Sequence, residues 1–135
     1  MDISKALAVS ARGMDAQTAR LRVVAENLAN QDTTGSTPGA EPYRRKVITF
    51  ESRLDRALDA ETVRVKSIKP DQGTLPQRFD PSHPAADVQG YVRTPNVNTF
   101  IEVMDMREAQ RSYTANLNVL EATRSMLTRT IELLK

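Results

Sequence analysis

The fold of this chain is decided by NTFIEVMDMREAQRSYTANLNVLEATRSMLTRTIELL, a proline-free stretch at residues 98–134. Apolar side chains recur along it in two interleaved seven-residue repeats, which places them on one face of a helix. We therefore expect a long amphipathic helix that buries this face against another helix. The residues of this stripe are Val103, Met106, Tyr113, Leu117, Leu120, Leu127, Ile131 and Leu134.

A second proline-free segment, at residues 2–30, carries the same repeat. We expect a helix that starts at a cap on Asp2 or Ser4 and stops near Asn30, where Asn, Asp and Thr side chains compete for backbone hydrogen bonds. All seven prolines lie between this segment and the C-terminal one. The stripe on this helix consists of Ile3, Leu7, Met14, Leu21, Val24 and Leu28.

Three polar side chains interrupt the stripes: Gln17, Gln110 and Arg124. A polar group at such a position can fix the register of two helices by penalising misaligned partners. The stripes can equally be broader than a strict seam, with these side chains reaching solvent. The stripes themselves either pair within one chain as a helical hairpin or pack against other subunits.

The proline-containing middle predicts a small β-rich insert. Residues 46–50, 63–68 and 90–93 favour short strands, while 50–58 also fits a two-turn helix and 70–84 is expected to be irregular. The predicted fold class is mainly α, with long N- and C-terminal helices packed as a coiled-coil-like pair that brackets the insert. The expected domains are residues 1–31 and 98–135, which form an assembly domain, and the middle domain at 32–97.

The length of the C-terminal helix favours assembly with other chains. At about 1.5 Å per residue it spans roughly 55 Å, and the N-terminal helix roughly 40 Å. A compact chain of this size has a radius of gyration of only about 14 Å. Part of the longer stripe therefore stays uncovered within one chain.

Composition argues against catalysis. The chain has no cysteine and a single histidine, His83, which lies between Asp80 and Asp87 in a proline-flanked stretch. This spacing fits no metal site and predicts an exposed polar turn. No phosphate-binding loop, nucleophile motif or carboxylate pair is present. We expect no enzyme activity, no catalytic residue, no cofactor and no metal.

Charge and hydropathy argue against two further classes of partner. The net charge is +2, and the one dense basic run, Arg44-Arg45-Lys46, is a weak nucleic-acid footprint expected in a solvated or phosphate-touching loop. We expect no nucleic-acid partner. No apolar run approaches the roughly 18 residues of a membrane span. No cleavable signal peptide is visible, so export would use a route that reads none.

Two segments resemble the signatures of the bacterial flagellar rod and hook family. The first is AENLAN at residues 25–30, preceded by GMDAQ at 13–17, and the second is MDMREAQRSYTAN at 104–116. The loop at 32–42 is longer than the Thr-Pro-Gly-Tyr turn of many rod and hook proteins, which is typical of the proximal-rod branch. The segments that resemble this branch are PYRRK at 42–46, DPSHP at 80–84, ADVQGYV at 86–92 and PNVN at 95–98.

This resemblance implies a structural subunit of the flagellar basal-body rod in the periplasmic space, exported by the flagellar type III apparatus without signal cleavage. Such a subunit polymerises helically with itself and other rod proteins through its terminal helices, transmits torque and encloses the export channel. Its middle domain would face outward, toward neighbouring subunits or the surrounding rings. The family motif residues are Asn27, Asn30, Gln110, Arg111, Tyr113 and Asn116.

The alternative function is a soluble coiled-coil adaptor or chaperone of the same export system. Its helices would stay folded in the free protein, whereas free rod subunits of this family commonly have disordered ends. Circular dichroism and NMR of the purified monomer would distinguish the two.

Overall fold

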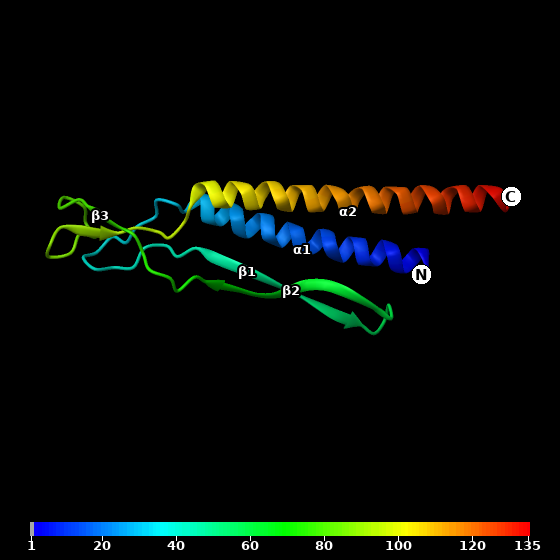
Figure 1. The fold of residues 1–135 in the computed structure, drawn as a ribbon, viewed down its shortest axis with the longest axis horizontal. Coiled ribbons are helices and arrows are strands. Elements are labelled where there is room, and N and C mark those ends of the chain that lie inside the picture. Colours follow the sequence, from blue (N-terminus) through cyan, green and yellow to red (C-terminus); the bar gives the residue numbers. More distant parts are fainter. Residues whose placement is uncertain (1) are drawn as a thin grey trace. The chain divides into compact units, whose positions relative to one another are not determined.

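The computed structural model describes residues 2–135, in which two helices bracket two small sheets (Figure 1). The chain forms two compact units. Unit 1 comprises Met1–Leu21, Ile48–Ser67 and Met106–Lys135, and unit 2 comprises Arg22–Val47 and Ile68–Asp105. The elements are α1 (Ile3–Ala29), β1 (Lys46–Asp55), β2 (Ala60–Pro70), β3 (Gln77–Phe79), β4 (Tyr91–Arg93) and α2 (Thr99–Leu133).

The helices of unit 1 run antiparallel and approach closely. Gly13 of α1 lies against Asn116 of α2, and Arg20 pairs with Glu108 at 3.4 Å. A Cβ at Gly13 would lie 2.9 Å from the amide nitrogen of Asn116, so glycine permits this approach where a larger residue would force a shift. The buried residues near the contact are also small: Ser10, Ala16 and Ala109.

The C-terminal turns of α2 extend beyond the start of α1 in unit 1 (Figure 1). Because Gly13 lies opposite Asn116 in this antiparallel pair, Ile3, the first residue of α1, is level with about Met126 of α2. Every residue from 124 to 135 is exposed. This end of the helix therefore has no cover from α1.

The β1–β2 hairpin completes unit 1. The two strands form their own sheet, and Thr49 and Glu51 of β1 contact Ser67 and Arg64 of β2 at 2.7 and 2.5 Å. Asp59 takes a left-handed φ of 49° in the turn. Because β1 continues to Asp55, the two-turn helix considered for 50–58 is wrong.

Unit 2 holds the second sheet. β3 and β4 pair antiparallel, with Arg78 opposite Val92, whose side chain is fully buried. The rings of Phe79 and Tyr91 meet edge to face at 5.3 Å. The extended piece predicted at 90–93 is confirmed as β4, but its partner β3 lies in the stretch expected to be irregular.

The first turns of both helices are capped by the residues that the sequence predicted. Asn98 accepts the amides of Phe100 and Ile101 through Oδ1 at 3.0 and 3.3 Å, and Asp2 accepts that of Ser4 at 3.4 Å. The bracketing of a β middle by two helices is confirmed. The helices hold 27 and 35 of the 135 residues, so the class mainly α is only partly right.

Candidate functional site

A cluster of buried and half-buried polar side chains lies in unit 2, where the end of α1 meets the start of α2 and the first residue of β1. We call Asn27, Tyr43, Arg45, Lys46 and Glu102 the junction cluster. Glu102 is 0% exposed and Asn27 is 1% exposed. Buried polar groups are costly unless partners satisfy them, so the hydrogen bonds of this cluster determine what holds the junction together.

Asn27 lies at the centre of the junction cluster. Its Nδ2 donates to the carbonyl oxygen of Lys46 at 3.0 Å and to Oε2 of Glu102 at 3.2 Å. Its Oδ1 accepts the backbone N–H of Lys46 at 2.9 Å and the hydroxyl of Tyr43 at 2.7 Å. The carboxamide thus binds the Lys46 backbone as a neighbouring strand would, and fixes the start of β1 to α1.

Glu102 supplies the buried negative charge of the cluster. Arg45 donates from Nε to its Oε1, and a second guanidinium nitrogen lies 3.4 Å from Oδ2 of Asp105. Glu102 is also in the first turn of α2, where the helix dipole favours an acidic side chain. The backbone N–H of Arg45 donates to Oδ1 of Asn96 at 2.8 Å. Arg45 is therefore tied to α2 and to the segment that precedes it.

The sequence suggested that the basic run at residues 44–46 forms a solvated or phosphate-touching loop. In the structure its side chains bind other parts of the protein instead. Arg44 donates to the carbonyl oxygens of Asp71 and Gly73 at 3.1 and 3.0 Å. Lys46 donates to Glu26 at 2.8 Å, which raises the pKa of Lys46. Burial raises the pKa of Tyr43, just before the run, so its phenol stays protonated and donates to Asn27. The partners of the basic run lie far from it in sequence, so local composition could not predict these contacts.

The structure gives different roles to the family motif residues. Asn27 belongs to the junction cluster, and Asn30 closes the end of α1 by donating to the carbonyl oxygen of Glu26 at 2.8 Å and accepting from Thr33 at 3.1 Å. Asn116 lies against Gly13, so the two signature segments meet within unit 1. Gln110 and Arg111 are exposed, and Tyr113 is half-buried.

The stripe residues differ in burial. Val24 is buried, whereas Leu127, Ile131 and Leu134 are exposed. Of the polar interruptions, Gln110 and Arg124 reach solvent, while Gln17 is half-buried with no hydrogen bond on its Oε1 among residues 2–135. The role of the stripes in assembly stays a prediction. The half-buried members are Ile3, Leu7, Met14, Leu21, Leu28, Val103, Met106, Tyr113, Leu117 and Leu120.

His83 lies in a turn, as expected, but is half-buried. Its Nδ1 accepts the N–H of Ala85 at 3.0 Å, and its Nε2 lies 3.1 Å from the Thr34 hydroxyl. Asp80 and Asp87 instead bind hydroxyl and backbone groups of their own turns. In the described part of the chain no three His, Cys, Asp or Glu side chains gather as a metal site would require, and no helix could cross a bilayer.

Sequence reasoning missed Glu102 and the partners of Arg45. An acidic residue in a helix usually faces water, so nothing in the local pattern marked Glu102 for burial. The available indication was a run of three cations shortly before a predicted strand, together with an acid four residues after the Asn98 cap. Cations of that kind require counter-charges wherever they are not solvated.

The junction cluster predicts a specific effect of Asn27→Asp. An aspartate keeps the acceptors for Tyr43 and the Lys46 amide but loses both donors, and places a second carboxylate beside Glu102. We expect the free energy of unfolding to fall by about 2–3 kcal/mol at neutral pH.

Urea unfolding followed by circular dichroism and tyrosine fluorescence would measure this loss. Asn30→Asp is the matched control, since it makes the same change three residues further along and removes one hydrogen bond at the helix end. We expect it to cost no more than about 1 kcal/mol. Equal losses in the two variants would show that Asn27 is not the centre of the cluster.

Two family models match this chain, one at each end. Residues 7–37 match the flagella basal body rod protein family, and residues 88–133 match the C-terminal family of the flagellar basal body rod FlgEFG proteins. The first match contains Gly13, Asn27 and Asn30, and the second contains Glu102 and Asn116. Both halves of the antiparallel helix contact thus fall in rod protein families.

The relatives that match along almost their whole length share one name. The chain is 50% identical to flagellar basal-body rod protein FlgC of Agrobacterium fabrum over 98% of its length and 96% of the relative. It is 41% identical to FlgC of Aquifex aeolicus (98% and 97% covered) and 36% identical to FlgC of Salmonella typhimurium (93% and 92% covered). The proteins of this family are structural rod proteins and not enzymes. The comparisons therefore do not favour the alternative function of an adaptor or chaperone. The chain belongs to the FlgC family of flagellar basal-body rod proteins.

Proposed function

We propose that this chain is a structural subunit of the flagellar basal-body rod that polymerises helically, with itself and with other rod proteins, through its terminal helices. The terminal segments, 1–31 and 98–135, form the assembly domain and pack in the tube wall as coiled-coil-like helices. The middle domain, residues 32–97, faces outward toward neighbouring subunits or the surrounding rings. The assembled rod transmits torque and encloses the export channel.

One observation carries this proposal: the uncovered end of α2. Ile131 is 51% exposed and Leu134 is 84% exposed, and both belong to the apolar stripe. The register of the helix pair leaves these turns beyond the start of α1. A heterologous contact that does not close into a ring propagates as a helical polymer, and each subunit in such a polymer can receive its missing cover from the next.

The location follows from the same proposal. A rod subunit reaches the periplasmic space through the flagellar type III export apparatus, without removal of a signal peptide. Mass spectrometry of the subunit in purified basal bodies should therefore find an uncleaved N-terminal segment. A subunit that lacks its first helix would contradict this route.

Deletion of the gene is the decisive experiment. Cells without it should have no hooks or filaments by electron microscopy and should not spread in soft agar, because the structures beyond the rod have no base on which to assemble. A plasmid copy of the wild-type gene should restore both. Flagellated, motile deletion cells would refute the proposed function.

A further inference from the structure

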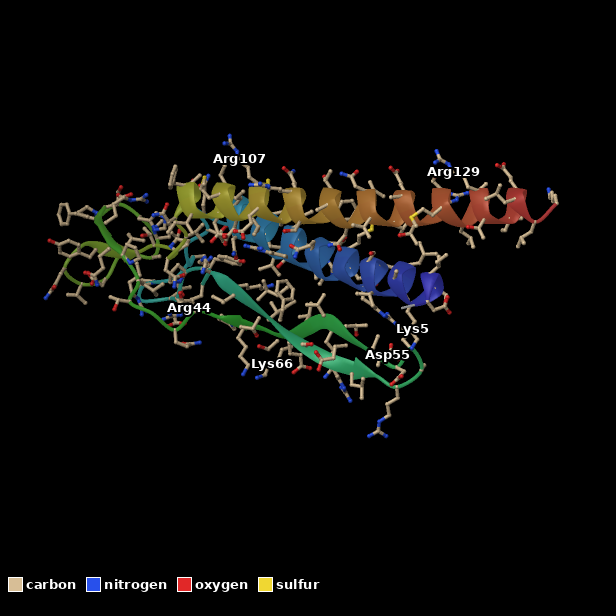
Figure 2. The ribbon with its side chains drawn as sticks, turned by 45° about the vertical axis from the view of Figure 1, so that its right-hand side comes forward. Lys5, Arg44, Asp55, Lys66, Arg107 and Arg129 are labelled. Atoms are coloured by element: carbon tan, nitrogen blue, oxygen red, sulfur yellow. The ribbon has the colours of Figure 1, made fainter. Side chains whose placement is uncertain are left out.

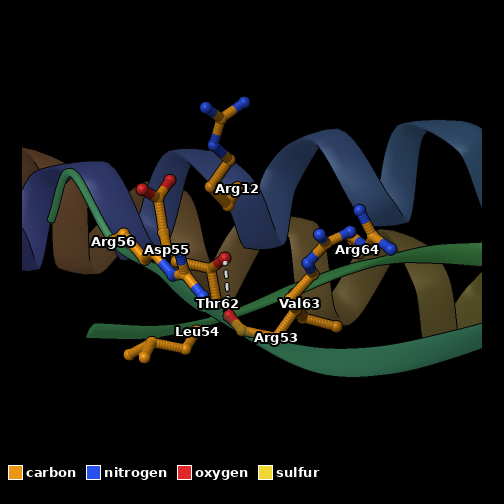
Figure 3. Close-up of a pocket in the computed structure, with 8 residues that line it drawn as sticks. All are labelled: Arg12, Arg53, Leu54, Asp55, Arg56, Thr62, Val63 and Arg64. Atoms are coloured by element: carbon orange, nitrogen blue, oxygen red, sulfur yellow. Dashed lines mark hydrogen bonds between the residues drawn. The ribbon is translucent and has the colours of Figure 1, made fainter. Parts of the chain in front are cut away.

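A cavity in unit 1 is lined with arginine. Its volume is about 790 Å³, within the usual range of ligand-binding clefts. Figure 3 shows that Arg12 comes from α1, while the remaining residues come from the β1–β2 hairpin. We call this the arginine cavity; it is lined by Arg12, Arg53, Leu54, Asp55, Arg56, Thr62, Val63 and Arg64.

The positive charge of the arginine cavity is not balanced. The guanidinium groups of Arg12, Arg53 and Arg56 are exposed and have no hydrogen bond or ion pair within residues 2–135. Arg64 is paired with Glu51 at 2.5 Å. Asp55 offsets one further charge, although its Oδ1 already accepts two backbone amides in the turn. An excess of two positive charges therefore remains around one hollow.

The lining indicates which kind of anion fits. Nucleic-acid sites combine a row of cations along a groove with aromatic rings on which bases stack. Here arginines line a single cavity, no aromatic side chain lines it, and Asp55 would repel a dense chain of phosphates. Guanidinium groups bind carboxylates through paired hydrogen bonds.

We propose that the arginine cavity binds glutamate or aspartate side chains of an acidic segment on a neighbouring protein of the rod. The cavity thus determines which partner sits beside the hairpin, because a neutral or basic segment would leave the three arginines unpaired. This inference rests on the proposed function, which supplies the neighbour. It adds a second contact that does not use the apolar stripes.

A charge-reversal pair tests the cavity in cells that lack the chromosomal gene. Arg53→Glu with Arg56→Glu should reduce the soft-agar swimming diameter at least about threefold relative to the wild-type plasmid. Lys66→Glu with Lys69→Glu is the matched control: both lysines lie on β2 outside the cavity, and the charge change is the same. We expect near-normal swimming from the control, with equal amounts of subunit by immunoblot.

Photo-crosslinking identifies the occupant. A photoreactive phenylalanine derivative at Leu54 of the cavity, placed in assembled rods, should form an adduct within a peptide that carries at least two acidic residues. The same residue at Thr49, which does not line the cavity, is the control. No adduct at Leu54, or one to a basic or neutral peptide or to nucleic acid, would overturn the proposal.

The outcomes separate this proposal from the function on which it rests. If the deletion strain itself swims, the proposed function fails. If only the wild-type gene and the lysine control restore swimming, the cavity proposal holds. If the arginine pair also swims normally, or if the lysine pair is equally impaired, the arginine cavity has no specific role while the rod assignment remains intact.

Discussion

Glu102→Ala is expected to lower the free energy of unfolding by about 3–5 kcal/mol. The side chain is fully buried and accepts from Arg45 and from Asn27. Without it, a guanidinium group whose side chain is only 23% exposed loses its main counter-charge, and one donor of Asn27 has no acceptor. Removing one member of a buried ion pair costs far more than the intact pair contributes.

Urea unfolding of the purified chain would measure this effect. Glu41→Ala is the control within the same unit: Glu41 pairs with Arg44 at 3.3 Å and with Arg93 at 3.8 Å but is exposed, so its loss should leave the midpoint close to that of the wild type. If Glu102→Ala does not fold, Glu102→Gln keeps the volume and some hydrogen bonds and should give an intermediate loss. A midpoint for Glu102→Gln equal to the wild type would contradict a charge-based junction.

The helices were predictable because their pattern is long and uninterrupted. Each helix carries a seven-residue repeat without proline. The Asn-rich segment marks the end of α1 and Asn98 marks the start of α2, and the predicted bounds of both helices agree with the structure to within one or two residues. The β1–β2 hairpin was harder to predict, since Phe50, Leu54 and Leu58 share a helical spacing. Pairing along β2 outweighs that spacing, and no local pattern can reveal a partner strand.

The chemistry of the junction cluster depends on contacts that sequence spacing cannot supply. Asn27 belongs to a recognisable motif, but its side chain makes four hydrogen bonds, and they go to three residues that are distant in sequence, 43, 46 and 102. The motif indicates that Asn27 is important in the family. Only the fold shows that its carboxamide takes the place of a neighbouring strand for the Lys46 backbone. Likewise, the helix repeat identified the stripes but not that Gly13 lies against Asn116 in the helix pair.

Leu127→Asp with Ile131→Asp is expected to abolish rod assembly. The two side chains are four residues apart on one face of α2, beyond the cover of α1. Burial of each in an interface would contribute about 1.5–3 kcal/mol, whereas a buried carboxylate is strongly unfavourable. Cells that carry only this variant should lack hooks and filaments by electron microscopy and should fail to swim.

The exposure of Leu127 and Ile131 allows an effect on assembly to be distinguished from an effect on folding. Leu21 and Leu120, on the same stripes, are half-buried within the chain, so an aspartate there would also disturb the subunit itself. Leu127 and Ile131 are exposed, so the purified variant should unfold at the wild-type urea concentration. Arg129, on the side of α2 that points away from α1 in Figure 2, provides the control Arg129→Asp, which should assemble. Normal rods from the Leu127/Ile131 variant would mean that this end of α2 meets solvent in the assembled rod, and that the stripes stop short of the interface.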